Sequence, residues 1–335
     1  MVNKNKLLSV NNLKTYFPTD EGVVKAVDGV TFDVEPGKTL GIVGESGCGK
    51  STVGRSLLQI LDNPGKIVEG EIHFQSDSAG GIVDLAQEKP GSALMRQVRG
   101  GEIALIFQEP MTSFSPVHTV GNQVVEAIQL HMEVSKKNAL ARAEELFDLV
   151  GIPNPKSRLN EYAYQLSGGL RQRAMIAMAL SADPKLLIAD EPTTALDVTT
   201  QAQILELLKT LQKQNNMAIV MITHNLGVIA EMADDVVVMY LGKAVEVGNI
   251  DDIFHDPQHP YTQGLLRSIP SIYTEGEGRL PSIRGSIPHP FNRPSGCTFR
   301  TRCPDYIEGE CNSAIPQLQT IGKTDRTVSC FKVHP

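Results

Sequence analysis

The fold is decided by the stretch Gly44-Glu45-Ser46-Gly47-Cys48-Gly49-Lys50-Ser51. It follows a short apolar run at 39–43 and precedes an amphipathic stretch from residue 51 to about 61, so a buried strand, a glycine-rich turn and a helix are predicted in that order. Glycines let successive backbone N–H groups converge on an anion at the N-terminus of a helix. The stretch therefore predicts a phosphate-binding loop.

The side chains of this loop suit a nucleoside triphosphate bound with Mg²⁺. Lys50 is expected to reach the β- and γ-phosphates, and the Ser51 hydroxyl is expected to bind Mg²⁺. ATP and Mg²⁺ are therefore the predicted cofactors. The loop residues predicted to contact the nucleotide are Gly44, Ser46, Gly47, Cys48, Gly49, Lys50, Ser51 and Thr52.

A second apolar run, at 186–189, ends in two carboxylates, Asp190 and Glu191. Open α/β sheets bind ligands at the carboxyl ends of their strands, so Asp190 is predicted to hold the metal ion. Glu191 is predicted to orient or deprotonate the attacking water. A strand that ends in Asp-Glu is by itself more often a solvated edge, but the phosphate loop earlier in the chain favours the catalytic reading.

Composition indicates a folded protein with a substantial core. The 335 residues are 41% hydrophobic and 21% charged. No apolar run approaches the ~18 residues needed to cross a bilayer, and no signal core is visible near the N-terminus, so a cytoplasmic location is expected. The net charge of −7 disfavours a protein that mainly coats nucleic acid, and no nucleic acid is expected among its partners.

The hydrophobic pattern predicts an α/β fold of the P-loop NTPase class. Runs at 23–28 and 30–34 predict an antiparallel β lead-in, and apolar spacings of three or four between 119 and 164 predict a helical insertion. Runs at 186–189, 218–222 and 236–240 predict a parallel, doubly wound sheet. The predicted domains are a P-loop ATPase core at 1–112 and 165–265, a helical subdomain at 113–164 and a small Cys-rich C-terminal domain at 266–335.

Further motifs resemble those of ABC-type ATPases. The stretch Leu166-Ser167-Gly168-Gly169-Leu170-Arg171-Gln172-Arg173 resembles their signature motif, although the family usually has Gln where this chain has Leu170. Gln108, in Ile106-Phe107-Gln108-Glu109-Pro110, resembles their Q-loop. The stretch Ala195-Leu196-Asp197 resembles their D-loop, and His224 resembles their switch histidine. The resemblance extends from residue 7 to about 250.

This resemblance implies an ABC-type nucleotide-binding domain that works as a head-to-tail dimer. ATP then lies between the phosphate loop of one domain and Ser167, Gly168 and Gly169 of the other. In this scheme Glu191 acts on water and His224 holds the γ-phosphate. The other roles that the resemblance implies are sensing of metal and water by Gln108, dimer contact by Asp197, and adenine stacking by Tyr16, with Phe17 as its alternative.

The segment His255-Asp256-Pro257-Gln258-His259-Pro260-Tyr261-Thr262 resembles one found in dipeptide and oligopeptide importers, which also carry a Cys-bearing tail. Membership implies an ATPase subunit at the cytoplasmic face of the membrane, held there by separately encoded permease subunits. A second ATPase subunit, identical or paralogous, and indirectly an extracytoplasmic peptide-binding receptor are its other implied partners.

Three alternatives stay open at this point. Similar importers handle nickel or other small solutes. A DNA-associated or ribosome-associated ABC-type ATPase is disfavoured because the cassette occurs once and the chain is acidic. A redox-sensing binding module with vestigial hydrolysis is suggested by the Cys-bearing tail, but the presence of Lys50, Asp190, Glu191 and His224 weighs against it.

Four of the five cysteines lie near the C-terminus, with spacing C-x5-C-x7-C-x18-C. Four soft thiolates in a reducing compartment suit a [4Fe–4S] cluster or a tetrahedral Zn²⁺. Nearby arginines would offset the negative charge of a cluster, which favours iron–sulfur over zinc. Four independent thiols are the remaining alternative. The predicted ligands are Cys297, Cys303, Cys311 and Cys330.

Overall fold

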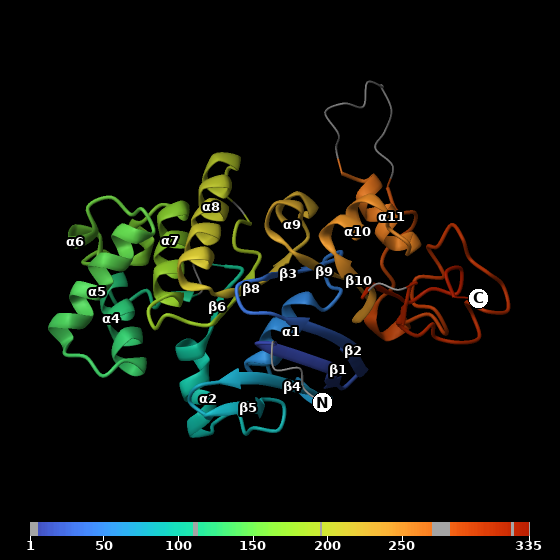
Figure 1. Ribbon diagram of the computed structural model, residues 1–335, viewed down its shortest axis with the longest axis horizontal. Helices are drawn as coiled ribbons and strands as arrows, with labels where there is room; N and C mark the ends of the chain where they lie inside the picture. The colour runs from blue at the N-terminus through green and yellow to red at the C-terminus, as the bar shows by residue number, and fades with distance from the viewer. Residues whose placement is uncertain (1–5, 110–112, 195, 270–281, 323–324, 335) are drawn as a thin grey trace. The chain divides into compact units, whose positions relative to one another are not determined.

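The computed structural model describes residues 6–109, 113–194, 196–269, 282–322 and 325–334 (Figure 1). Pro110 and Ala195, which belong to the stretches that resemble the Q-loop and the D-loop, lie outside these ranges. The chain forms two compact units, each described by itself below. The first contains residues 1–8, 34–38 and 73–221, and the second contains residues 9–33, 39–72 and 222–335.

The first unit contains a group of buried parallel strands. β6 (Ile103–Ile106) pairs in parallel with β7 (Leu186–Asp190), and β8 (Ala218–Thr223) follows β7 in the sheet order. Every residue of β7 and β8 is buried, as expected for strands covered on both faces. The runs predicted at 186–189 and 218–222 are therefore confirmed as strands. Ahead of them, the end of β4 (Lys66–Ser76) pairs antiparallel with β5 (Gly81–Asp84).

The helical insertion is also confirmed. Side-chain oxygens of Thr119, Ser135 and Ser167 accept hydrogen bonds from backbone N–H groups at the starts of α4, α5 and α7, which fixes where these helices begin. The helical elements of this unit are α2 (Ala93–Gln97), η1 (Val98–Glu102), α4 (Val120–His131), α5 (Lys136–Leu149), α6 (Pro155–Arg158), η2 (Ala163–Gln165), α7 (Gly168–Ala179) and α8 (Val198–Asn215).

The second unit contains the strand and helix that flank the phosphate loop. Its strands follow the order β11-β12-β10-β9-β3, in which β3 and β9 are parallel and the other pairs are antiparallel. β1 lies between β2 and β4 in the lead-in sheet. The elements of this unit are β1 (Leu8–Thr19), β2 (Gly22–Val34), β3 (Thr39–Val43), α1 (Lys50–Leu57), α9 (Leu226–Met232), β9 (Asp235–Tyr240), β10 (Lys243–Asn249), α10 (Ile250–His255), α11 (Pro260–Arg267), η3 (Pro290–Asn292), β11 (Gln319–Thr320) and β12 (Thr327–Val328).

Two local predictions differ from the structure. The runs at 23–28 and 30–34 form one strand, β2, because Gly29 takes a φ of 91° and continues it rather than ending it. Helix α1 ends at Leu57 and not near 61, since Gln59 adopts the left-handed conformation with a φ of 49°. Neither difference alters the strand-loop-helix order around the phosphate loop.

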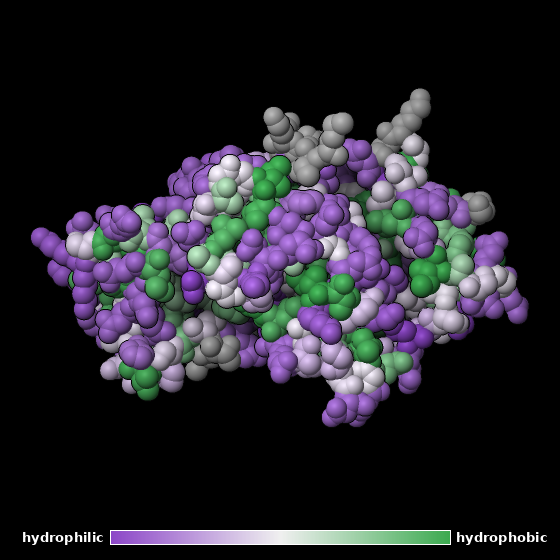
Figure 2. All heavy atoms as spheres, turned by 90° about the horizontal axis from the view of Figure 1, so that it is seen from below, coloured by the Kyte–Doolittle hydropathy of each residue, from purple (hydrophilic) through white to green (hydrophobic). Residues whose placement is uncertain are grey.

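The surface is polar over most of the face seen in Figure 2, with hydrophobic side chains gathered in separate patches. Among the residues that the structure describes, no helix combines the length and the apolar character that a membrane crossing requires. Most core side chains are aliphatic, and the largest fully buried ones include the aromatic residues Phe74, Phe147, Tyr240, Tyr261 and Phe299.

Candidate nucleotide-binding site

The phosphate loop has the backbone that its glycines predict. Gly47 and Gly49 have φ values of 78° and 99°, which side chains with a Cβ rarely adopt. A Cβ on Gly49 would also lie 2.0 Å from the carbonyl oxygen of Ala26. Helix α1 begins at the next residue, Lys50, so the N-terminal end of the helix adjoins the loop. This arrangement suits an anion at the helix N-terminus.

Lys50 lies inside the loop rather than in solvent. Only 5% of its surface is exposed, and its ammonium donates to the carbonyl oxygens of Gly44 at 2.8 Å and Glu45 at 3.2 Å. Hydrogen bonds to neutral carbonyls balance a buried charge less well than bonds to an anion do. A phosphate group in the loop would therefore attract this ammonium strongly.

Cys48 is buried in the same loop. Burial raises the pKa of its thiol, more than the nearby Lys50 charge lowers it, so the thiol stays protonated. A protonated, buried thiol is unreactive.

Asp190 is the last residue of β7 and Glu191 follows it; both are buried, with 6% and 8% of their surfaces exposed. Glu191 has a φ of 49°, a strained backbone for a residue with a long side chain. Its carboxylate oxygen Oε2 accepts hydrogen bonds from the Gln108 amide at 3.1 Å and from the Thr194 hydroxyl at 2.9 Å. The structure therefore brings together two residues that the sequence predicted separately, Gln108 and Glu191. Thr194 was not predicted as a site residue.

His224 follows the last residue of β8 and is exposed, so it is not a core histidine. The next residue, Asn225, caps α9: its side-chain oxygen accepts hydrogen bonds from the N–H groups of Gly227 and Val228. The cap fixes where the chain turns after β8.

The signature loop is exposed at the start of α7. The Ser167 hydroxyl accepts a hydrogen bond from the backbone N–H of Leu170, and Ser167 and Gly168 are exposed. Because this contact uses the backbone of Leu170, the departure from Gln at that position leaves it intact. The Asp197 carboxylate caps the start of α8 in the same way, because it accepts hydrogen bonds from the backbone N–H and the hydroxyl of Thr200. These bonds lower the pKa of its carboxyl group.

Tyr16 is held through its hydroxyl, which donates to Asp28 at 2.7 Å. The other carboxylate oxygen of Asp28 lies 2.9 Å from Arg293 and 3.3 Å from Lys243. Burial opposes the charge of Asp28, but the hydrogen bond from Tyr16 and the two cations together lower its pKa to about 2. The Lys25 ammonium lies 5.4 Å from the centre of the Tyr16 ring.

The four C-terminal cysteines are free thiols that lie within electrostatic reach of one another. Burial, followed by the charges of Cys311 and Cys330, raises the pKa of Cys297 to about 11. Burial and the charges of Cys297 and Cys330 raise that of Cys303 to about 12. The sulfur of Cys311 also accepts from the Ile307 N–H at 3.4 Å. Among the side chains that the structure describes, no group of three or more His, Cys, Asp or Glu is arranged to hold a metal ion.

One contact of the phosphate loop was not predictable from the sequence. The Arg302 guanidinium makes two parallel hydrogen bonds to the Glu45 carboxylate, at 2.6 and 3.0 Å, across 257 positions of sequence. The Tyr261 hydroxyl accepts from the backbone N–H of Glu45 at 2.9 Å. Glu45 occupies a variable position of the motif, so its type carries no signal for such a partner.

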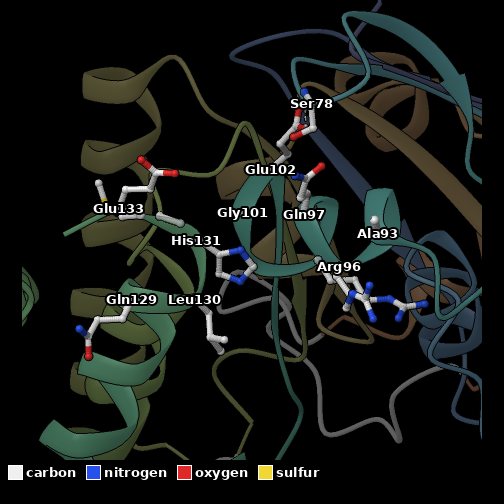
Figure 3. Close-up of a pocket in the computed structure, with 13 residues that line it drawn as sticks. Ser78, Ala93, Arg96, Gln97, Gly101, Glu102, Gln129, Leu130, His131 and Glu133 are labelled. Carbon is white, nitrogen blue, oxygen red and sulfur yellow. Dashed lines mark hydrogen bonds between the residues drawn. The ribbon is translucent and has the colours of Figure 1, made fainter. Parts of the chain in front are cut away.

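A separate cavity of about 900 Å³ lies in the first unit (Figure 3). The end of α4 contributes Leu130 and His131, and the opposite wall contains Arg96 and Glu102. Burial lowers the pKa of His131. None of the residues predicted for nucleotide or metal binding lines this cavity.

Comparison with solved structures identifies the class. A dimeric ATP-binding cassette in a post-hydrolysis state, bound to ADP and phosphate, matches with a TM-score of 0.64 at 24% identity, over 72% of this chain and 98% of that chain. CbiO1 from Clostridium perfringens, part of an ABC transporter complex, matches with a TM-score of 0.61 at 25% identity, over 76% and 92%. The fold is that of an ABC-type ATP-binding cassette.

The sequence comparisons then give the family. The ABC transporter model matches residues 27–194, and the model for the oligopeptide/dipeptide transporter C-terminal region matches residues 245–311. The dipeptide transport ATP-binding protein DppD of Haemophilus influenzae is 47% identical over 97% of this chain and 94% of its own length. The oligopeptide transport ATP-binding protein AppD of Bacillus subtilis is 48% identical over 97% and 96%. The chain belongs to the ABC transporter family, in its oligopeptide/dipeptide branch, as its motifs predicted.

Proposed function

We propose that this chain is the ATP-hydrolysing subunit of a membrane importer for dipeptides or oligopeptides. The observation that carries the proposal is the Glu191 carboxylate, which is buried directly after β7 and held by Gln108 and Thr194. A carboxylate fixed in this way beside a metal-binding Asp190 suits activation of water for phosphoryl transfer. The names of the relatives support peptides as the transported solutes.

Each predicted site residue has a role in this chemistry. Lys50 and the N–H groups of the loop bind the β- and γ-phosphates, while Ser51 and Asp190 are the protein groups that would hold Mg²⁺, which offsets phosphate charge. Glu191 takes a proton from a water molecule while the oxygen of that water attacks the γ-phosphorus. The bond between the γ-phosphorus and the ADP oxygen then breaks. His224 contacts the γ-phosphate, and Tyr16 stacks on adenine.

Dimerisation completes the site. The exposure of Ser167 and Gly168 at the start of α7 supports a role in which they meet the γ-phosphate held by a second ATPase subunit, identical or paralogous. Asp197 organises the contact. Binding of ATP closes the pair, hydrolysis opens it, and the motion passes to separately encoded permease subunits at the cytoplasmic face of the membrane. A peptide-binding receptor outside the membrane delivers the solute.

The test is uptake by the assembled transporter in membrane vesicles, with ATP supplied on the side of this subunit. Uptake of a labelled dipeptide that requires ATP, and that stops when Glu191 is changed to Gln, supports the proposal. ATP-dependent uptake of nickel without uptake of peptide would assign the alternative small-solute function. Stimulation of hydrolysis by DNA or ribosomes, without transport, would overturn the importer role.

For the four cysteines we propose a [4Fe–4S] cluster, with Zn²⁺ as the alternative. The donor set supports it: four free thiols lie in one segment, and the pKa values of Cys297 and Cys303 are raised first by burial and then by neighbouring cysteines, so a bound metal would stabilise thiolates that are otherwise disfavoured. Such a group would cross-link a segment that has little regular secondary structure among its described residues. The test is iron, zinc and acid-labile sulfide content of protein purified without oxygen. Iron with matching sulfide supports the cluster, zinc without sulfide the alternative, and neither would overturn both.

A further inference from the structure

We infer that Arg302 of the C-terminal segment is a positioning residue of the phosphate loop, so that docking of this segment sets the affinity for nucleotide. The inference rests on the proposed function, because it assigns a role within the same ATP site. The C-terminal segment is defined here as the described residues 282–322 and 325–334. Arg302 is buried, with 4% of its side chain exposed, and it reaches Glu45, which directly follows the first glycine of the loop.

Glu45 is held at three of its groups. Its carboxylate accepts the two bonds from Arg302, at 2.6 and 3.0 Å. Its backbone N–H donates to the Tyr261 hydroxyl at 2.9 Å, and its carbonyl accepts from Lys50 at 3.2 Å. Fixing both the side chain and the backbone of one residue fixes the peptide planes on either side of it. Those planes belong to the loop whose N–H groups bind phosphate.

Arg302 is itself fixed, which makes it an effective anchor. Its Nε donates to the carbonyl of Arg284 at 3.0 Å, and its guanidinium lies 5.8 Å from the centre of the Tyr240 ring. The ring of Phe299, three residues earlier, packs edge-on against the same tyrosine at 5.2 Å between ring centres. A guanidinium with this much support loses little freedom when it binds the carboxylate.

A second arginine of the same segment supports the other end of the loop. Arg293 binds Asp28 at 2.9 Å, and the backbone N–H of Asp28 donates to the Gly242 carbonyl at 2.7 Å. The N–H of Gly242 in turn donates to the Cys48 carbonyl at 2.9 Å. The segment therefore contacts the loop directly at Glu45 and, through two intervening hydrogen bonds, at Cys48.

The position of Arg302 in the chain could couple its contact with Glu45 to the state of the C-terminal cysteines. It directly precedes Cys303, one of the four clustered cysteines. A change in the state of those cysteines that displaces Arg302 would release the Glu45 carboxylate and loosen the loop. By linkage, nucleotide binding would affect the cysteines to the same degree.

The test is a double-mutant cycle on the full chain with Glu45→Gln, Arg302→Gln and both together. The readouts are the Kd for trinitrophenyl-ATP, by fluorescence, and kcat and KM for ATP. Each single change should raise the Kd and KM about tenfold while kcat changes less, and the double variant should be little worse than either single one. The exchanged pair, Glu45→Arg with Arg302→Glu, should regain part of the affinity.

Controls separate positioning from a general effect on folding. Arg300→Gln alters a partly exposed arginine of the same segment, which donates to the Ser295 carbonyl and does not contact Glu45, and should leave the Kd unchanged. If Arg302→Gln fails to fold, Arg302→Lys takes its place in the cycle. It keeps the positive charge but cannot make the two parallel hydrogen bonds to Glu45. If the parent chain binds trinitrophenyl-ATP and the folded Arg302 and Glu45 variants bind it equally well, the inference is wrong. A parent chain that does not bind this nucleotide would instead overturn the proposed function.

Discussion

The side-chain amide of Gln108 donates a hydrogen bond to the carboxylate of Glu191 at 3.1 Å, although the two residues are 83 positions apart. The bond holds one oxygen of the predicted base in a defined direction. Gln108→Leu should therefore lower kcat for ATP hydrolysis about tenfold and leave the Kd for ATP nearly unchanged, because loss of orientation affects the reaction more than binding. Thr194→Val, which removes the hydrogen bond from the Thr194 hydroxyl to Glu191, should also lower kcat and leave the Kd nearly unchanged. A variant of Gln108 with normal kcat would show that this bond plays no part in catalysis.

Glu191→Gln should preserve binding of ATP but reduce hydrolysis by about 10² to 10⁴-fold. The amide keeps the size of the side chain and its place after β7, but it accepts no proton from water. Phosphate release by the purified protein measures the effect, and nucleotide fluorescence checks that binding remains. Turnover close to the original rate would refute the assignment of Glu191 as the base.

Lys50→Ala should remove most of the affinity for ATP. The buried ammonium of Lys50 is the cation that the loop offers to the β- and γ-phosphates. Equilibrium binding of trinitrophenyl-ATP tests this, with Lys66→Ala, at an exposed position of β4, as the matched control. Equal affinities of the two variants would contradict the assignment of Lys50 to phosphate binding.

His259 should make the free energy of unfolding depend on pH in mild acid. Its Nδ1 accepts from the Tyr261 N–H, and complete burial lowers its pKa to about 3. Below its usual pKa of 6.5 the unfolded chain binds a proton that the folded chain does not, so stability falls as the pH drops from about 6.5 toward 3. The slope is at most about 1.4 kcal/mol per pH unit.

The matched variant is His259→Asn, which keeps an acceptor at the start of α11 but does not titrate. Urea unfolding at pH 7.5 and 5.5 should show a loss of stability that is about 1 kcal/mol smaller in this variant than in the parent chain. Identical losses in the two proteins would indicate that His259 is not buried in its neutral form.

Local parts of the fold and site were predictable from sequence because local chemistry determines them. The strand-loop-helix order around Lys50 follows from an apolar run, a set of glycines and an amphipathic stretch. The start of α7 at Gly168 follows from the capping hydroxyl of Ser167. The motifs likewise predicted the family that the comparisons show.

The contacts that support the site were not predictable, because they join residues far apart in the chain. Nothing about Glu45 as a residue type indicates a partner 257 positions later, and the same holds for Asp28 and Arg293, which are 265 positions apart. The end of α1 was also missed, since the left-handed turn at Gln59 uses neither Gly nor Asn.

The pairing of β12 with β10 has a consequence for how the protein is made. Glu246 and Val247 of β10 lie opposite Val328 and Thr327, and the N–H of Ser329 donates to the Val245 carbonyl. This short strand covers what would otherwise be an open sheet edge, which is the kind of surface that templates aggregation. Since β10 is synthesised well before β12, a nascent chain exposes that edge until the C-terminal segment emerges. Chains truncated before residue 327 should therefore aggregate rather than behave as smaller ATPases.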